Sequence, residues 1–168
     1  MTMERARRMN LIALALLITA LIAYIAFHFL PLEVYPPDLY GIEPDRGYEV
    51  WGEVVEFAKD PSANDPQDMI ALAGFLCAAF LIIVSPFLVP LLHRSRWMWW
   101  TVVLVSGATL CGLGGVLLLI FFHDGEAIPG SGIHCLLAAL ALNFLGLLFI
   151  RREKSPLESE SFAPPPVV

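Results

Sequence analysis

Apolar residues gather in four long blocks along this chain, and polar or charged residues fill the segments between them. The blocks cover residues 9–30, 66–92, 97–122 and 132–150. A helix rises about 1.5 Å per residue, so about twenty apolar residues cross a hydrocarbon layer of roughly 30 Å. The blocks lack the charged face that a helix of a soluble domain needs. The pattern predicts an all-α membrane protein with four transmembrane helices in a bundle.

The connecting segments complete the predicted organisation. Residues 1–8 form the N-terminus, residues 93–96 a short turn, and residues 123–131 a second loop. The tail at 151–168 is polar, ends in prolines and is predicted to be disordered. A long acidic loop, residues 31–65, joins the first two spans. Residues 47–59 of this loop have helical period and predict a short amphipathic helix.

The apolar face of this short helix is a candidate partner interface. Tyr48, Trp51 and Val55 fall on that face, and glutamates fall on the other. A helix that lies on an anionic bilayer usually has a basic polar face, and this polar face is acidic. We therefore expect the helix to dock on the outer end of the bundle or on a partner protein.

Basic residues fall on one side of the four-span arrangement. Eight of the ten lie in the two termini or the 93–96 turn, and only Arg46 and Lys59 lie on the other side. The positive-inside rule then predicts that both termini are cytoplasmic. The chain has no N-glycosylation sequon, and its three cysteines lie inside apolar blocks. These features favour a bacterial inner membrane and no disulfide framework.

The net charge of −6 comes largely from acids in the predicted outer loops. Solvation of the loops accounts for this charge, and a field that attracts cations or a basic partner is the alternative. We expect no nucleic acid partner for this acidic chain.

Small residues line the predicted spans and favour close helix packing. In the third span Gly107, Cys111, Gly112 and Gly115 take part in small-xxx-small pairs. Lipid tails are as apolar as leucine, so close backbone approach holds membrane helices together. The third span is therefore predicted to be the helix against which the others pack.

The other spans carry similar stripes. In the fourth span Ala139 and Gly146 continue a heptad repeat that begins at Gly132, and Asn143 is the strongest polar residue at depth. Its amide is expected to form an interhelical hydrogen bond worth about 0.6–2 kcal/mol. The first two spans offer Ala15, Thr19 and Ala23, and Ala71, Ala78 and Ser85, respectively.

Three histidines fall within about one helical turn, roughly 5 Å, of the predicted outer boundary. His28 ends the first span, His123 ends the third and His134 opens the fourth. Neutral imidazoles at a wet rim can bind zinc, copper or a haem iron, with Asp124 or Glu126 as further ligands. The other interpretation is that these histidines suit an interface without binding metal, and their spacing matches no known metal motif.

No catalytic constellation is recognisable, and no Asp, Glu, Lys or Arg lies deep inside a span. These absences favour a non-catalytic accessory, assembly or scaffold subunit with no cofactor, bound to the lipid bilayer and to a protein partner. A metal- or haem-binding redox protein is the first alternative. A small-molecule or lipid carrier with a cavity near Asn143 and the proline kink at Pro86 is the second.

Overall fold

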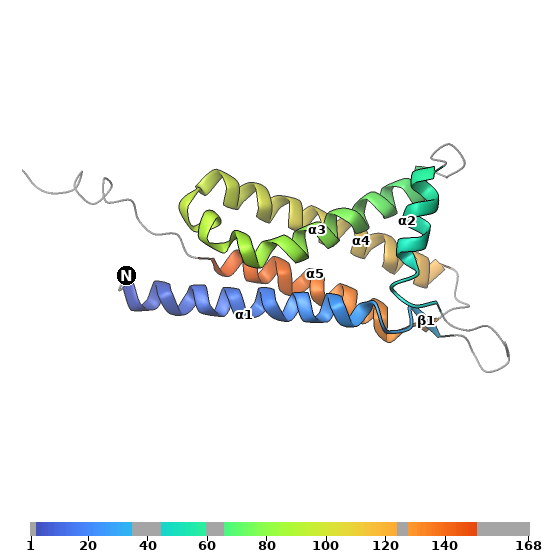
Figure 1. Cartoon of the computed structure of the whole chain (residues 1–168), viewed down its shortest axis with the longest axis horizontal. Coiled ribbons are helices and arrows are strands. Elements are labelled where there is room, and N and C mark those ends of the chain that lie inside the picture. Colours follow the sequence, from blue (N-terminus) through green and yellow to red (C-terminus); the bar gives the residue numbers. More distant parts are fainter. Residues whose placement is uncertain (1–2, 35–44, 60–65, 124–127, 151–168) are drawn as a thin grey trace, which may run out of the picture.

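The computed structural model describes residues 3–34, 45–59, 66–123 and 128–150 (Figure 1). Within these residues the long helices are α1 (Met3–Phe27), α3 (Pro66–Arg94), α4 (Arg96–His123) and α5 (Ser131–Phe149). A short helix, α2 (Val50–Lys59), lies between α1 and α3 along the chain. The four long helices are long and apolar enough to cross a membrane. The predicted all-α bundle with a short helix in the first loop is confirmed. The predicted tail lies outside the described residues.

Local sequence explains where these helices begin and end. Pro66 opens α3, where its missing N–H costs no helical hydrogen bond. The α3–α4 turn is centred on Ser95, whose hydroxyl accepts a hydrogen bond of 3.4 Å from the Met98 N–H. Pro31 lies just beyond the C-terminal end of α1 and cannot continue it. One end of the bundle is formed by the α3–α4 turn, and we call it the turn end. The opposite end lies beside α2, and we call it the α2 end.

Segments that flank α1 and α5 close the α2 end (Figure 1). Strands β1 (Glu33–Val34) and β2 (Ile128–Pro129) pair antiparallel, and Pro31 forms a bridge with Arg46. The 31–34 segment thus lies between the 45–47 segment and the start of α5. Close backbone approach here requires Gly130, because a Cβ at that position would overlap the Pro31 carbonyl oxygen.

The helix at the centre of the bundle is α5. It contacts α1, α3 and α4, and its contact with α1 is the most extensive between any two helices of the described chain. Of its apolar span 44% is buried, compared with 22% for α4. The prediction that the third span, now α4, is the central helix is therefore wrong. Small residues identify a helix that permits close approach, but they do not say that a neighbour in the same chain occupies it.

The buried stripe of α1 also differs from the predicted one. Ala15 and Thr19 are exposed, and the buried positions are Ala13, Leu17, Ala20, Tyr24 and Phe27. A helix that is apolar all round gives no polar face by which to choose the packing side, so this prediction failed.

Two apolar clusters make up the core. The α2-end cluster includes Tyr24, Phe27, Phe75, Ile82 and Leu140. The turn-end cluster includes Ala13, Leu17, Leu92, Val103 and Leu147.

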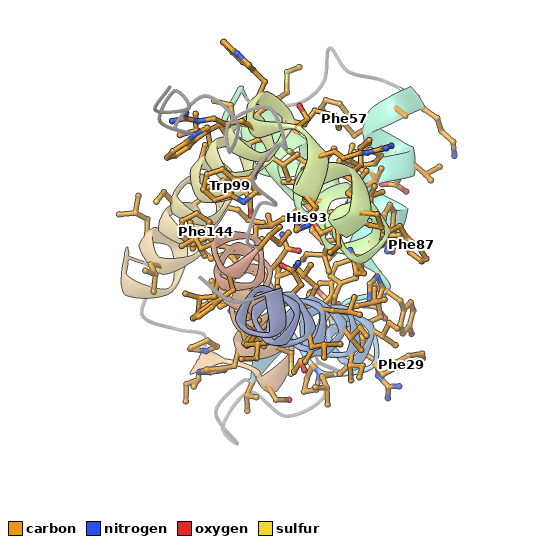
Figure 2. The ribbon with its side chains drawn as sticks, turned by 90° about the vertical axis from the view of Figure 1, so that its left-hand side faces the viewer. Phe29, Phe57, Phe87, His93, Trp99 and Phe144 are labelled. Carbon is orange, nitrogen blue, oxygen red and sulfur yellow. The ribbon has the colours of Figure 1, made fainter. Side chains whose placement is uncertain are left out.

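Figure 2 views the bundle from the turn end. Trp99 and Phe144 lie among the helices in this view, and both pack against the turn-end cluster. Phe29 and Phe87 project from the outside of the bundle, where they are 71% and 76% exposed. Exposed phenylalanines are expected where a helix faces lipid.

Candidate functional site

An open apolar groove runs between α3 and α4, with a cavity volume of about 330 Å³. Ile70 and Gly74 line it from α3, and Val105, Ala108 and Gly112 line it from α4. The groove exists because the side chains along this part of both helices are small or short. A transmembrane helix or an acyl chain could be accommodated there by shape alone.

The glycines of α4 differ in their surroundings. A Cβ added to Gly107 would lie 3.1 Å from the Phe144 ring of α5, so this glycine permits close packing inside the bundle. Apart from its chain neighbours and its own helix backbone, a Cβ added to Gly112 or Gly115 would have no heavy atom of the described residues within 4 Å. Cys111 and Gly112 are exposed. The small residues of α4 therefore divide into an inner set near Gly107 and an outer set near Gly112.

The polar atom that lines the groove is satisfied within the chain. The Thr109 hydroxyl lies 2.9 Å from the Val105 carbonyl oxygen and 3.5 Å from the Cys77 sulfur. Serine and threonine hydroxyls in membrane helices commonly bond to the preceding turn in this way. The groove therefore presents a nearly apolar surface.

The small residues of α5 lie on its packed face. Gly132, Ala139 and Gly146 are all buried. A Cβ on Gly146 would lie 2.8 Å from Leu17 Cδ2 and 3.2 Å from the Ala13 carbonyl oxygen. The heptad stripe is thus buried, and at Gly146 it packs against α1.

Asn143 forms the kind of interhelical hydrogen bond expected of it. Its side-chain nitrogen donates to the Ser106 hydroxyl of α4 at 3.2 Å, and both residues are buried. The carrier hypothesis required a cavity beside Asn143. The α3–α4 groove is lined by other residues, and Asn143 is only 1% exposed.

His28 joins α1 to α2 at the α2 end. Its Nδ1 lies 2.9 Å from the Tyr24 carbonyl oxygen, so Nδ1 is the protonated nitrogen that donates there. The Trp51 indole N–H donates to His28 Nε2 at 2.8 Å, and the two ring planes are nearly parallel, at 13° to each other. Trp51 also packs edge-on against Phe75 of α3. No feature of the sequence pattern linked Trp51 to His28, because the two lie 23 residues apart.

Of the three histidines predicted at the outer rim, the structure describes the side chains of His28 and His134. Both ring nitrogens of His28 are engaged, so a metal would have to displace Trp51 from Nε2. His134 is exposed and its Nδ1 bonds to the Gly130 carbonyl oxygen at 2.9 Å. The side chain of His123 lies outside the described part, as do Asp124 and Glu126. Among the described residues no three His, Cys, Asp or Glu side chains gather into a metal site.

The three predicted interface residues of the short helix have different surroundings. Val50, Trp51 and Val54 pack against the α2-end cluster, so α2 docks on the bundle. Tyr48 and Val55 remain 49% and 52% exposed. Of the three predicted interface residues, Tyr48 and Val55 are therefore the ones that remain accessible to a partner.

A group of acids gives the segment before α2 its electrostatic character. The Asp45 side chain is exposed, but partial desolvation still raises its pKa, and the hydrogen bond and negative charge of Glu49, with the charge of Glu33, raise it further. The Glu49 carboxylate also accepts a hydrogen bond of 3.2 Å from the Arg46 backbone N–H. The described part of this segment is thus an acidic turn held by a hydrogen bond between Glu49 and the Arg46 backbone.

Comparisons with protein-family models, curated proteins and solved structures give no match to this chain.

Proposed function

We propose that this chain is a non-catalytic subunit of a membrane complex, and that a transmembrane helix of its protein partner binds in the α3–α4 groove. The observation that carries the proposal is the open space beside Gly112, which lines the groove from the least buried of the four spans. In a bilayer, small residues on an exposed helix face let a second backbone approach closely.

Glycine is a costly choice where nothing packs against it. Inside a helix it is less favourable than alanine by about 0.5–1 kcal/mol. Gly107 offsets this cost through its contact with Phe144, whereas Gly112 has no such contact within the described chain. A partner helix at the groove would supply the missing packing.

The orientation of the bundle follows from charge. Arg94 and Arg96 flank the turn end, and the start of α1 lies beside them, where Asn10 bonds to His93. Trp97 is 85% exposed at the same end, as expected of an indole at a membrane interface. We assign the turn end and both termini to the cytoplasm, in a bacterial inner membrane. Tyr48 and Val55 would then offer the partner a second contact outside the membrane.

Co-purification in mild detergent tests this function. The tagged chain is expected to bring down one partner at a fixed ratio. Gly112→Val should reduce its recovery about tenfold or more, because the two methyl groups fill the groove. Leu104→Val is the matched control, since Leu104 is 65% exposed on α4 and does not line the groove. A homogeneous, partner-free monomer from both the wild type and the control contradicts the proposal.

The metal- or haem-binding alternative has weaker support, because His28 already uses both ring nitrogens within the chain. An absorbance spectrum and elemental analysis of the purified protein test it directly. A stoichiometric metal or a Soret band would favour it over the accessory role.

A further inference from the structure

A layer of small and polar residues crosses the bundle between the two apolar clusters. It consists of Ala20 from α1, Ser85 from α3, Ser106 from α4 and Asn143 from α5. Their side chains are 0%, 0%, 2% and 1% exposed. Ile82 on one side of Ser85 belongs to the α2-end cluster. Each long helix thus contributes one small or polar residue to this layer, which lies between the two apolar clusters.

These residues lie at similar depth. Asn143 and Ser106 are hydrogen-bonded to each other. Ser85 and Ser106 lie ten and eleven residues from Ser95, at the centre of the turn that joins antiparallel α3 and α4 (Figure 1). At about 1.5 Å per residue both serines are roughly 15 Å from that turn, near the middle of a hydrocarbon layer roughly 30 Å thick.

The layer contains buried polar atoms without partners in the described chain. The amide oxygen of Asn143 and the hydroxyl of Ser85 are both buried and unpaired. Pro86 has no N–H, so the carbonyl of Ile82 also loses its helical donor. In a membrane interior such groups have no lipid partner, and leaving them unpaired is costly.

A third unpaired group comes from α1. The Tyr24 hydroxyl is buried without a partner, and Tyr24 lies about one helical turn beyond Ala20. Helical side chains lean toward the N-terminus of their helix, which for Tyr24 is toward the layer. The Tyr24 ring belongs to the α2-end cluster and packs against Phe27 and His28, so its hydroxyl is a third buried, unpaired group on the α2 side of the layer.

We propose that this layer binds water, which bridges the Asn143 amide oxygen, the Ser85 hydroxyl and the Tyr24 hydroxyl. Water fits because it both donates and accepts, and a buried water typically makes about three hydrogen bonds. A metal cation fits less well, because residues 10–27, 69–92, 97–119 and 131–149 contain no Asp or Glu. An uncompensated charge there would be far costlier than a neutral water.

The direct test is water contact at the Asn143 side-chain amide. The chain has three asparagines, Asn10, Asn64 and Asn143, so ¹⁵N-asparagine labelling of an Asn10→Gln, Asn64→Gln variant reports Asn143 alone. In deuterated detergent micelles we expect a cross peak between this amide and water. Absence of the cross peak in the folded protein overturns the proposal.

Ser85→Ala also tests the layer, because a hydrated layer and a dry layer predict different changes in stability. If water bridges Ser85, its loss should lower the thermal midpoint by about 2 °C or more. If the layer is dry, removing an unpaired hydroxyl should leave the midpoint unchanged or raise it, which overturns the proposal. Thr19→Ala is the control, because Thr19 is exposed and bonds to the Ala15 carbonyl of its own helix. A wild-type midpoint that rises with sodium chloride but not with choline chloride would also overturn it, in favour of a cation.

Discussion

Helices α5 and α4 carry similar stripes of small residues but put them to different uses. In α5 the stripe meets α1 so closely that a Cβ on Gly146 would lie 2.8 Å from Leu17. In α4 a Cβ added to Gly112 would meet no neighbouring side chain of the described residues, so open space lies beside this glycine. Small residues in a membrane helix therefore indicate a surface that another helix can approach closely. Whether that surface is internal or external depends on where the rest of the chain packs.

The largest expected effect comes from replacing one glycine on each helix with valine, which tests whether the two stripes differ in their surroundings. Gly146→Val places two methyl groups against Leu17 and the backbone of Ala13, and overpacking of this kind costs about 1–3 kcal/mol. At position 112 a Cβ meets no neighbouring side chain of the described residues and the groove has room for the methyl groups, so Gly112→Val should change the stability of the isolated chain by less than about 0.5 kcal/mol. Thermal unfolding of both purified variants in the same detergent measures the contrast. Equal losses of stability would show that the two stripes do not differ.

A second substitution tests whether a hydrogen bond from Trp99 holds α4 to α5. The Trp99 indole N–H donates to the Leu147 carbonyl oxygen at 2.8 Å, at the turn end of the bundle. Trp99→Phe removes this bond and should cost about 0.5–1.5 kcal/mol. The lower part of that range is expected, because the same carbonyl also accepts from Ile150 N–H.

Trp97→Phe is the matched control for Trp99→Phe. Trp97 is 85% exposed, so in detergent its substitution should leave stability within about 0.5 kcal/mol of the wild type. Urea or thermal unfolding of the pair gives the difference. A larger loss for Trp97→Phe than for Trp99→Phe would mean that α4 is not held to α5 through this bond.

Features that depend on composition could be predicted from the sequence, whereas the choice of which helix face packs against a neighbour could be predicted only in part. Apolar length alone predicted the four spans, and helical period predicted the short helix before α3. The heptad of Gly132, Ala139 and Gly146 pointed to a packed face because the repeat continues along the whole of α5. The stripe of α4 gave no such guide, since small residues occur on several of its faces and its polar residues are too few to orient it.

Contacts between distant segments were beyond sequence reasoning for a different reason. His28 and Trp51 were each assigned to a plausible role, metal binding for one and partner binding for the other. Their hydrogen bond depends on how the 45–49 segment folds back over the end of α1, where the Tyr48 N–H donates to the His28 carbonyl oxygen at 3.1 Å. No periodicity within either helix contains that information.

The smallest expected effect is the pH dependence of stability that comes from Asp45, which lies in the segment beside α1 and α5 at the α2 end. Because the pKa of Asp45 is raised in the folded protein, the folded chain binds this proton more tightly than the unfolded chain does. Stability from this group is thus present at low pH and falls as the pH rises from the ordinary aspartate value of 3.8 through the raised folded value.

Asp45→Asn should remove this contribution. The backbone carbonyl of residue 45, which accepts from the Leu32 N–H, would be retained. We expect the difference in thermal midpoint, variant minus wild type, to increase slightly as the pH rises from about 3.5 to 6. The effect is small because the Asp45 side chain is exposed. A difference that decreases over the same range contradicts the sign.

Photo-crosslinking in intact membranes tests most directly whether the α4 stripe is an external binding surface. A photoreactive amino acid that replaces Ile70, which lines the groove and is 68% exposed, leaves the space beside Gly112 open. One at Phe80, which is 64% exposed on α3 and does not line the groove, serves as the control. We expect one discrete protein adduct from position 70 and only lipid adducts from position 80. Lipid adducts alone from both positions would contradict it.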